Sequence, residues 1–303
     1  MGTTRRTFVK QGALAMASAS FLSRNLFAGA KADHSVVGVQ LYSIRADMNK
    51  DALGTLQKLS AMGYKNVEHA NYVNRTFYKY SPADFKKVLG DNGLKMPSGH
   101  TMMGRQAWDT TKNDFSDAWK YTVEDAATVG QQYVITPSMD QGMTKTMDDF
   151  KKLMDIFNKC GELCKKSGMK FGYHNHAFEF SNVIEDHRIY DLLLANTDPN
   201  LVTQQLDIGN LYNGGGVAMD IVKKYPNRFM LMHVKDEIKN TKGTGEQYES
   251  CVLGEGIVNT KDVIDLGRKT GTQYFIIEQE SYGSKTPLDS VQEDLAIMKK
   301  WGF

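Results

Sequence analysis

The sequence predicts an α/β fold, a single-domain (β/α)8 TIM barrel, from three observations. First, apolar strands alternate with helical patterns over residues 33–303, in roughly eight strand–helix units, which is the rhythm of such a barrel. Second, several strands end in metal-competent side chains, which converge only if the strands run parallel around one axis. Third, no GxGxxG follows the first strand, so the competing doubly wound sheet lacks its expected signature.

The strands are expected as short apolar runs, most of which lead into polar residues. They are Val36–Leu41, Asn66–Glu68, Leu94–Met96, Tyr133–Thr136, a strand that opens at Lys170, strands that carry Asp207 and His233, and Tyr274–Glu280.

The helices are expected from their periodicity and from their end signals. Ser81 is an N-cap with Pro82 at the first helical position, and Gly63 and Gly130 end helices. The expected helices are Asp51–Met62, Ser81–Asn92, Asp114–Val129, Thr146–Ser167, Asp186–Ala195, Val217–Tyr225, Asn259–Lys269 and Pro287–Lys300. Between two of these units, Ile238–Gly256 is expected to be a long polar loop, and long loops in compact domains are usually functional.

Composition places the chain among ordinary globular proteins. Of its 303 residues 41% are hydrophobic, and 37 basic residues balance 35 acidic ones to a formal net charge of +2. This balance argues against a nucleic-acid surface. Three cysteines exclude a disulfide scaffold, and Cys160 and Cys164, four apart in a helical pattern, are interpreted as core residues.

Residues 1–30 resemble a twin-arginine export signal. Thr4–Lys10 reads TRRTFVK, an apolar stretch follows over Gly12–Leu22, and Ala28–Ala30 has the small-x-small pattern of a cleavage site. The apolar stretch is too short for a membrane span, so we expect no stable membrane anchor after cleavage and a periplasmic location. Twin-arginine export carries folded proteins, which fits a metal loaded in the cytoplasm.

The stretch Lys170–Phe180, KFGYHNHAFEF, ends an apolar strand in a group of polar side chains. His174 and His176 are two residues apart, so on an extended strand they point to one face. Such imidazoles act as metal ligands or as acid–base groups. Polar residues stand at the other strand ends: Glu68, His69, His100, Asp207, His233, Lys235 and Glu278.

Each of these residues alone could be a hydrogen-bonded loop residue or a helix cap. Their coincidence at consecutive strand ends predicts a binding site for one divalent metal. Mixed imidazole and carboxylate ligands suit Mn²⁺, Co²⁺, Mg²⁺, Fe²⁺ or Zn²⁺, and no sulfur ligand selects among them.

Six motifs together resemble the xylose-isomerase-like TIM barrels of the sugar phosphate isomerase/epimerase family, with a likeness also to inosose dehydratases. The resemblance covers Val36–Phe303. The motifs are GY-x-x-VE at 63–68, GYHNH-x-FEF at 172–180, LDIGN at 206–210, HVKD at 233–236, GEG at 254–256 and IE at 277–278.

The resemblance implies a metal site and shows one departure from the family pattern. In that family the metal is held by a fifth-strand carboxylate, an Asp, a His and a final Glu. The last three match Asp207, His233 and Glu278, whereas the fifth strand here carries His174. The resemblance therefore implies that these four residues bind the metal, with His176 as a substrate-facing acid or base.

The reaction implied by the resemblance is proton abstraction next to a sugar carbonyl through an enediolate, ending in isomerisation or epimerisation. His174 in place of a matched carboxylate leaves a second possibility, β-elimination from a keto-sugar or keto-glycoside by a dehydratase. A non-catalytic sugar-binding barrel is a more remote alternative. The expected partner is a small-molecule sugar. The predicted catalytic residues are Glu278, His176 and Lys235, and the predicted substrate-binding residues are Glu68, His100, Glu179 and Asp236.

Overall fold

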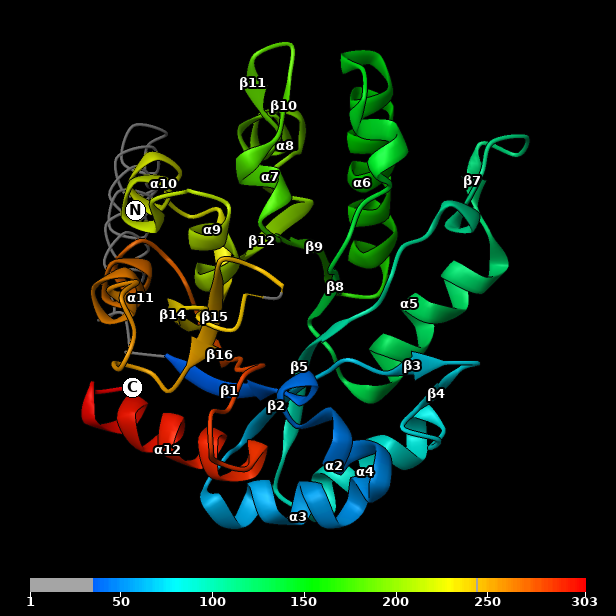
Figure 1. Cartoon of the computed structure of the whole chain (residues 1–303). Helices are drawn as coiled ribbons and strands as arrows, with labels where there is room; N and C mark the ends of the chain where they lie inside the picture. Colours follow the sequence, from blue (N-terminus) through cyan, green and yellow to red (C-terminus); the bar gives the residue numbers. More distant parts are fainter. Residues whose placement is uncertain (1–34, 244) are drawn as a thin grey trace, which may run out of the picture. The chain divides into compact units, whose positions relative to one another are not determined.

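The fold is a closed barrel of parallel strands surrounded by helices, in a computed structural model that describes residues 35–243 and 245–303 (Figure 1). Its strands follow one another in chain order, and the first closes the barrel by pairing with the second and the last. The predicted barrel is therefore confirmed, while the predicted signal, residues 1–30, lies outside the described residues. The barrel strands are β1 (Val36–Gln40), β2 (Asn66–His69), β5 (Lys95–His100), β8 (Tyr133–Thr136), β9 (Lys170–His174), β12 (Val202–Asp207), β13 (Phe229–Val234) and β16 (Tyr274–Ile277).

An apolar plug fills the barrel interior and so decides where polar side chains can converge. The plug comprises Ile135, Leu231 and Ile276 with the rings of Tyr133 and Tyr274, whose centroids lie 5.6 Å apart. Because β8 and β16 are not neighbours, this ring contact crosses the barrel. Residues two positions further along a strand point inward again, above the plug. The interior at the carboxyl ends of the strands is thus left to polar groups.

Helices cover the outside of the barrel, and their ends follow the predicted signals. Ser81 accepts a hydrogen bond from the backbone N–H of Asp84 at the start of α4. Gly63 and Gly130 cap α3 and α5 in the left-handed conformation, with φ of 104° and 100°. The helices are α2 (Arg45–Lys50), α3 (Ala52–Met62), α4 (Pro82–Asp91), α5 (Asp117–Val129), α6 (Met147–Lys166), α7 (Phe178–Ser181), α8 (Ile189–Asn196), α9 (Ile208–Asn213), α10 (Ala218–Lys224), α11 (Thr260–Lys269) and α12 (Pro287–Lys300). Within the described ranges, none is long and apolar enough to cross a membrane.

Two helices begin later than predicted because short hairpins take their first residues. The pair β6 (Trp108–Asp109) and β7 (Asp114–Phe115) precedes α5, which starts at Asp117 behind its Ser116 cap. The pair β10 (Val183–Ile184) and β11 (His187–Arg188) precedes α8. Its turn residues Glu185 and Asp186 have φ of 49° and 65°, which a helix does not allow.

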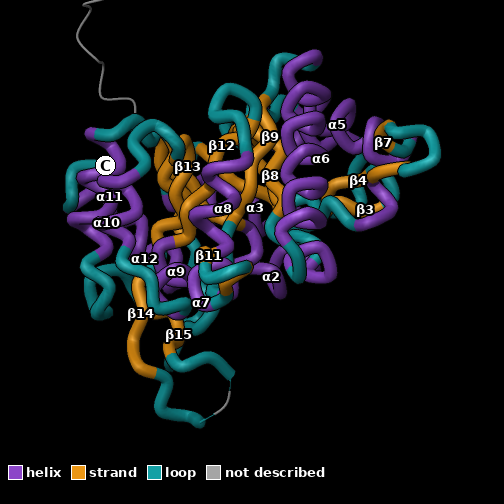
Figure 2. Tube along the Cα trace, turned by 90° about the horizontal axis from the view of Figure 1, so that it is seen from above, coloured by secondary structure: helices purple, strands orange, loops and turns teal. Residues whose placement is uncertain are grey.

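The segment Ile238–Gly256 contains most of a β-hairpin, namely the end of its first strand, its turn and its whole second strand. Antiparallel strands β14 (Asp236–Lys239) and β15 (Tyr248–Cys251) pair from Asp236↔Cys251 to Lys239↔Tyr248. Figure 2 shows this hairpin projecting from the barrel. The prediction of an unpaired loop was therefore wrong for these residues, because two short strands built mostly of polar residues leave no apolar periodicity to detect.

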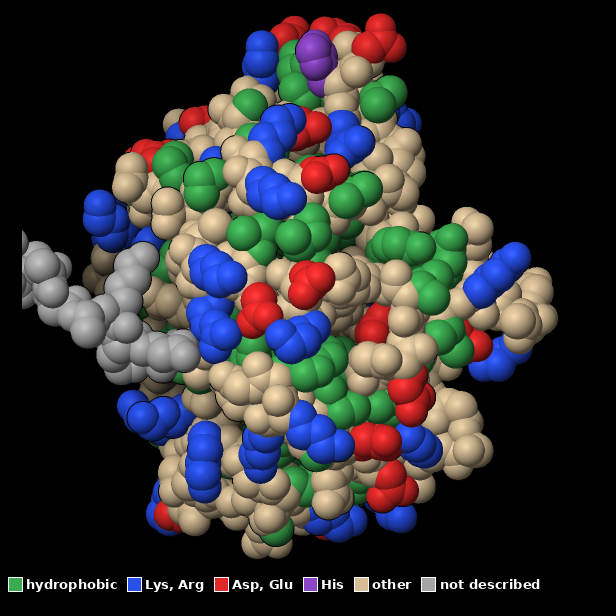
Figure 3. Space-filling view, turned by 90° about the vertical axis from the view of Figure 1, so that its left-hand side faces the viewer, with side chains coloured by type: hydrophobic (Ala, Val, Ile, Leu, Met, Phe, Trp, Pro, Cys, Tyr) green, Lys and Arg blue, Asp and Glu red, His purple; other side chains and the backbone are tan. Residues whose placement is uncertain are grey.

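Charges of both signs are mixed on the surface. On the face shown in Figure 3, Lys and Arg side chains are interspersed with acidic and hydrophobic ones. On α11, Lys261 and Arg268 both pair with Asp265, at 2.7 and 3.0 Å.

Candidate metal centre and active site

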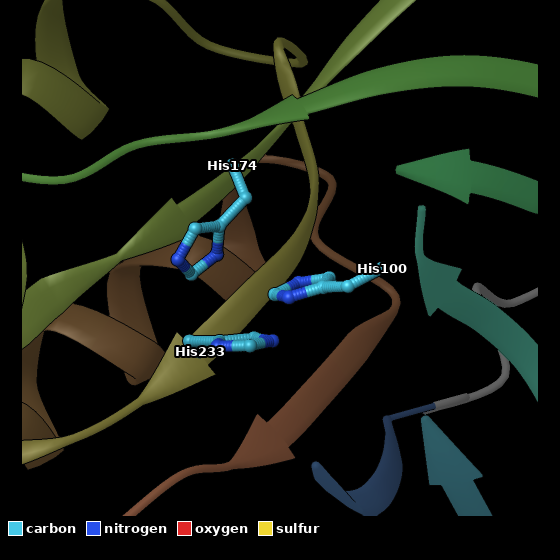
Figure 4. A group of neighbouring side chains, drawn as sticks. All are labelled: His100, His174 and His233. Carbon is cyan, nitrogen blue, oxygen red and sulfur yellow. The ribbon is translucent and has the colours of Figure 1, made fainter. Parts of the chain in front are cut away.

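Four side chains predicted as metal ligands meet above the apolar plug. His174 ends β9, Asp207 ends β12, His233 lies on β13 and Glu278 follows β16. One potential ligand atom of each lies within 4.8 Å of those of the other three, and all four residues are buried. Figure 4 shows the rings of His174 and His233 grouped with that of His100, which comes from β5. Two imidazoles and two carboxylates at this spacing fit a divalent ion.

Asp207 carries the clearest sign that this cluster suits a cation. Its Oδ1 accepts a hydrogen bond of 2.7 Å from the backbone N–H of Asn210 and so caps α9. Its Oδ2 is buried without a hydrogen-bond partner, 3.6 Å from Lys235 Nζ and 3.8 Å from His233 Nδ1. Burial raises the pKa of Asp207 to about 7, against the opposing effect of Lys235. An unpaired buried carboxylate oxygen is costly, and a bound cation would relieve that cost.

Glu68 lies beneath this cluster and orients His233. Glu68 Oε1 is 2.6 Å from His233 Nε2, while His233 Nδ1 faces Glu278 Oε2 at 3.1 Å. The other hydrogen bonds to Glu68 come from Gln40 and Gln205, both at 2.7 Å, and from Ser98. With Nε2 bound to a carboxylate, Nδ1 is the nitrogen left to face a metal. Glu68 is fully buried and does not line the cavity, which differs from its predicted substrate-binding role.

The charges around Glu68 hold it ionised. Burial opposes the ionised form, but His100 and His233 outweigh it and lower the pKa of Glu68 to about 2. Burial likewise opposes the charged form of His233, but Glu278 and Glu68 outweigh it and raise the pKa of His233 to about 10. A cation in the site would take the place of the Nδ1 proton of His233.

Glu68→Gln is expected to weaken divalent-metal binding about 10- to 100-fold, because the amide no longer fixes the tautomer of His233 as the carboxylate does. Equilibrium dialysis against a series of free metal concentrations measures the change. Glu162→Gln, an exposed substitution on α6, is the matched control. Unchanged metal affinity in Glu68→Gln, with a thermal melt like that of the wild type, would contradict the orienting role.

Gln205 links two of the histidines and was not predicted. Its Oε1 lies 2.6 Å from His100 Nε2 and 3.0 Å from His174 Nδ1, and its Nε2 donates to Glu68. Gln205 precedes Asp207 by two residues on β12, so strand alternation was the signal that placed both on the inward face. The sequence does not show which histidines Gln205 contacts, because that depends on how the neighbouring strands are aligned with β12.

The cluster opens into a cavity of about 890 Å³ at the carboxyl ends of the strands. Five predicted site residues line it: His100, His174, His176, Lys235 and Glu278. The lining residues that were not predicted as site residues include Tyr42, Met102, Phe178, Asn210, Glu237, Glu246, Tyr248, Glu249 and Glu280. A cavity that combines a few convergent polar groups with aromatic walls is typical of a small-molecule site.

Lys235 and His176 lie at the edge of the cluster with different charges. Lys235 Nζ is 3.2 Å from Glu278 Oε2 and 2.5 Å from Glu280 Oε1. Burial opposes its charge, but Asp207, Glu278 and Glu280 outweigh this and raise the pKa of Lys235. Burial, followed by the Lys235 ammonium, lowers the pKa of His176 to about 4. His176 is therefore a neutral imidazole at pH 7, able to accept a proton.

Glu179 is turned away from the cavity and supports His176. Its carboxylate accepts a hydrogen bond from the hydroxyl of Tyr173 and one of 2.8 Å from the backbone N–H of His176. The residue is fully buried and does not line the cavity. The placement of Glu179 therefore differs from the predicted contact with substrate. The turn into α7 leaves the backbone N–H of His176 without a helical partner, and the Glu179 carboxylate accepts its hydrogen bond instead.

The carboxylate of Asp236 is likewise occupied by hydrogen bonds from backbone N–H groups. Its carboxylate accepts hydrogen bonds of 2.9 to 3.2 Å from the N–H groups of Glu237, Gly254, Gly256 and Val258. Asp236 is buried and does not line the cavity, so its placement also differs from the predicted substrate contact. It ties the base of the β14–β15 hairpin to the segment that leads into α11.

In this barrel, imidazoles and carboxylates from the carboxyl ends of the strands meet in an open cavity. This arrangement defines the class of TIM barrels whose active-site face can bind a metal. The family model described as xylose isomerase-like TIM barrel matches residues 56–301. The chain belongs to this family.

Relatives and solved structures extend the comparison. Inosose dehydratase from Clostridium perfringens is 37% identical over 101 residues, 33% of this chain and 33% of that protein. Inosose dehydratase from Geobacillus kaustophilus is 33% identical over 194 residues, 64% of this chain and 53% of that protein. The chain thus matches about a third to a half of the length of these two curated relatives.

Among solved structures, a sugar phosphate isomerase/epimerase from Parabacteroides distasonis superposes with a TM-score of 0.77 at 26% identity, over 89% of this chain and 96% of that one. The IOLI protein with a bound zinc atom superposes with a TM-score of 0.67 over 88% of this chain and 97% of that one. At 14% identity the second likeness shows the fold alone.

Proposed function

We propose that this protein is a divalent-metal-dependent sugar isomerase or epimerase that removes a proton next to a sugar carbonyl. The observation that carries the proposal is the buried cluster of His174, Asp207, His233 and Glu278, opening into a cavity whose edge holds His176 and Lys235. A divalent ion held by the four cluster residues would supply Lewis-acid polarisation of the carbonyl.

The protein's own groups provide the remaining chemistry. His176, neutral and facing the cavity, accepts or returns a proton on one side of the sugar, and Glu278 serves on the other. Lys235, held between Glu278 and Glu280, presents a positive charge to oxygen atoms on which negative charge develops. His100, which is hydrogen-bonded to Gln205 and lines the cavity, binds a hydroxyl of the substrate in this proposal.

A dehydratase reaction is the second candidate, and two observations favour it. Curated relatives are inosose dehydratases, and the fifth strand carries His174 where a matched pair of carboxylate bases would require Glu. In that reaction His176 would accept the proton removed from the carbon next to the carbonyl and deliver it to the hydroxyl or glycosidic oxygen that leaves.

Incubating metal-loaded protein with keto-sugars in D₂O, followed by NMR, separates the two candidates. Deuterium at the carbon next to the carbonyl together with an isomer or epimer supports the main proposal. An unsaturated or dehydrated product supports the dehydratase. If no keto-sugar exchanges or reacts, both proposals are wrong.

We also propose that the protein is exported through its twin-arginine segment and matures near Lys31, on the motif at Thr4–Lys10. Replacing Arg5 and Arg6 together by Lys is expected to abolish export, because the paired guanidinium groups are what that signal presents. Immunoblots of periplasmic and cytoplasmic fractions measure the distribution. Lys10→Arg, which leaves the arginine pair intact, is the control variant. Full export of the double variant would contradict the proposal.

A further inference from the structure

Glu237 has an unused hydrogen-bonding oxygen in the wall of the cavity. The residue is only 2% exposed, lines the cavity, and has no hydrogen-bond partner for Oε2. Burial raises the pKa of Glu237 to about 8, against the opposing effect of Lys235. Leaving a buried carboxyl oxygen unpaired costs free energy, so a ligand that offers a hydroxyl group to it gains a favourable contact.

The sequence makes room for this carboxyl group. A Cβ on Gly209 would lie 2.5 Å from Glu237 Oε1 and 2.8 Å from the Lys235 side chain. Any larger residue at 209 would therefore displace Glu237 or Lys235. The glycine of the LDIGN motif thus leaves room for the Glu237 carboxyl group, which lines the cavity together with Asn210.

The charges of the cavity wall oppose an anionic ligand. Among the described lining residues, five side chains are carboxylic, of which Glu237 is mostly neutral at pH 7 because of its raised pKa, and Lys235 is the single amine or guanidinium group. Lys235 lies within 3.6 Å of three carboxylates, which leaves its charge compensated. Outside the lining, Lys242 pairs with Glu249 at 2.7 Å and is 62% exposed. The five carboxylic residues are Glu237, Glu246, Glu249, Glu278 and Glu280.

A divalent ion in the cluster would not supply a spare positive charge either. Asp207 and Glu278 bring one negative charge each to the cluster, which together offset the two charges of the ion. A phosphate dianion would thus lose its hydration shell next to carboxylates without gaining a free cation. Sugar hydroxyls, in contrast, donate to carboxylates and accept from Asn210 and Lys235.

We infer, building on the proposed function, that the substrate is an uncharged sugar rather than a sugar phosphate, and that Glu237 binds one of its hydroxyl groups. Glu237 is then a specificity-determining residue of the same site, and the acidic wall selects against phosphate esters.

The test measures binding of matched pairs to the metal-loaded full chain by isothermal titration calorimetry. The probes are D-fructose with D-fructose 6-phosphate and D-ribulose with D-ribulose 5-phosphate. Each free ketose is expected to bind at least about 10-fold more tightly than its phosphate ester.

Glu237→Gln should weaken ketose binding about 10-fold. Glu280→Gln, which frees Lys235 from one carboxylate, should narrow the gap between ketose and ester. Glu162→Gln on the surface of α6 is the control.

An ester that binds as tightly as its parent ketose overturns the inference, and so does wild-type ketose affinity in Glu237→Gln. Failure of both ketoses to bind also counts against it. Solvent exchange in D₂O, recorded on the same samples, separates this inference from the proposed function. Preferred exchange of the esters defeats the inference alone, whereas binding of ketoses with neither exchange nor product defeats the proposed function alone.

Discussion

Asp207→Asn is expected to lower divalent-metal affinity about 100-fold. Metal sites of this kind bind with on the order of 10 kcal/mol, so loss of one of four ligands removes roughly 2–3 kcal/mol. Asparagine is isosteric and keeps an oxygen for the backbone N–H of Asn210, so the cap of α9 is retained. The substitution therefore tests the ligand role of Oδ2 rather than the fold. Metal content after dialysis, measured by inductively coupled plasma mass spectrometry, reports the loss.

His233→Ala should give a similar or larger loss of metal, because it also leaves Glu68 without its imidazole partner. Asp191→Asn on α8 is the matched control, since that aspartate pairs with Lys224 at 2.9 Å away from the cluster. Wild-type metal content in both Asp207→Asn and His233→Ala would rule out this site.

His176→Gln is expected to lower turnover about 10²- to 10⁴-fold while leaving metal content unchanged, because His176 lines the cavity but is outside the four-residue cluster. Slow deuterium exchange at a single carbon should persist, since Glu278 still reaches one side of the sugar. Stopped assays of product and NMR in D₂O measure the two effects separately.

A matched control for that variant is His187→Gln, in the exposed β10–β11 hairpin. Wild-type turnover in His176→Gln would remove His176 from the mechanism. Loss of metal together with turnover would instead place it among the ligands.

The barrel and the positions of its polar strand ends could be predicted because they depend on local patterns. Apolar runs fix each strand, and a strand carries Asp207 or His233 to its carboxyl end whatever its neighbours are. Parallel closure then requires these ends to meet, and in the structure one potential ligand atom from each of the four predicted residues lies within 4.8 Å of the others.

The roles of Glu68, Glu179 and Asp236 could not be predicted, because each depends on a partner that sequence patterns do not identify. Glu68 meets His233 only because the closed barrel brings side chains of β2 and β13, which are not neighbouring strands, together in its interior. Glu179 and Asp236 bind backbone N–H groups whose freedom depends on turn geometry. Glu237 was missed because it lies between the HVKD motif, which ends at Asp236, and the predicted loop, which begins at Ile238.

The hydrogen bonds of Glu68 also bear on when the proposed site could take up an ion. Its partners lie on β1, β5, β12 and β13, so the carboxylate is held only after early and late parts of the chain have come together. An incomplete polypeptide on the ribosome therefore lacks the full set of contacts that directs Nδ1 of His233 toward the four-residue cluster. In the proposed metal site, uptake of an ion is therefore expected to follow closure of the barrel, and the compartment in which the chain finishes folding would decide which ion is offered to it.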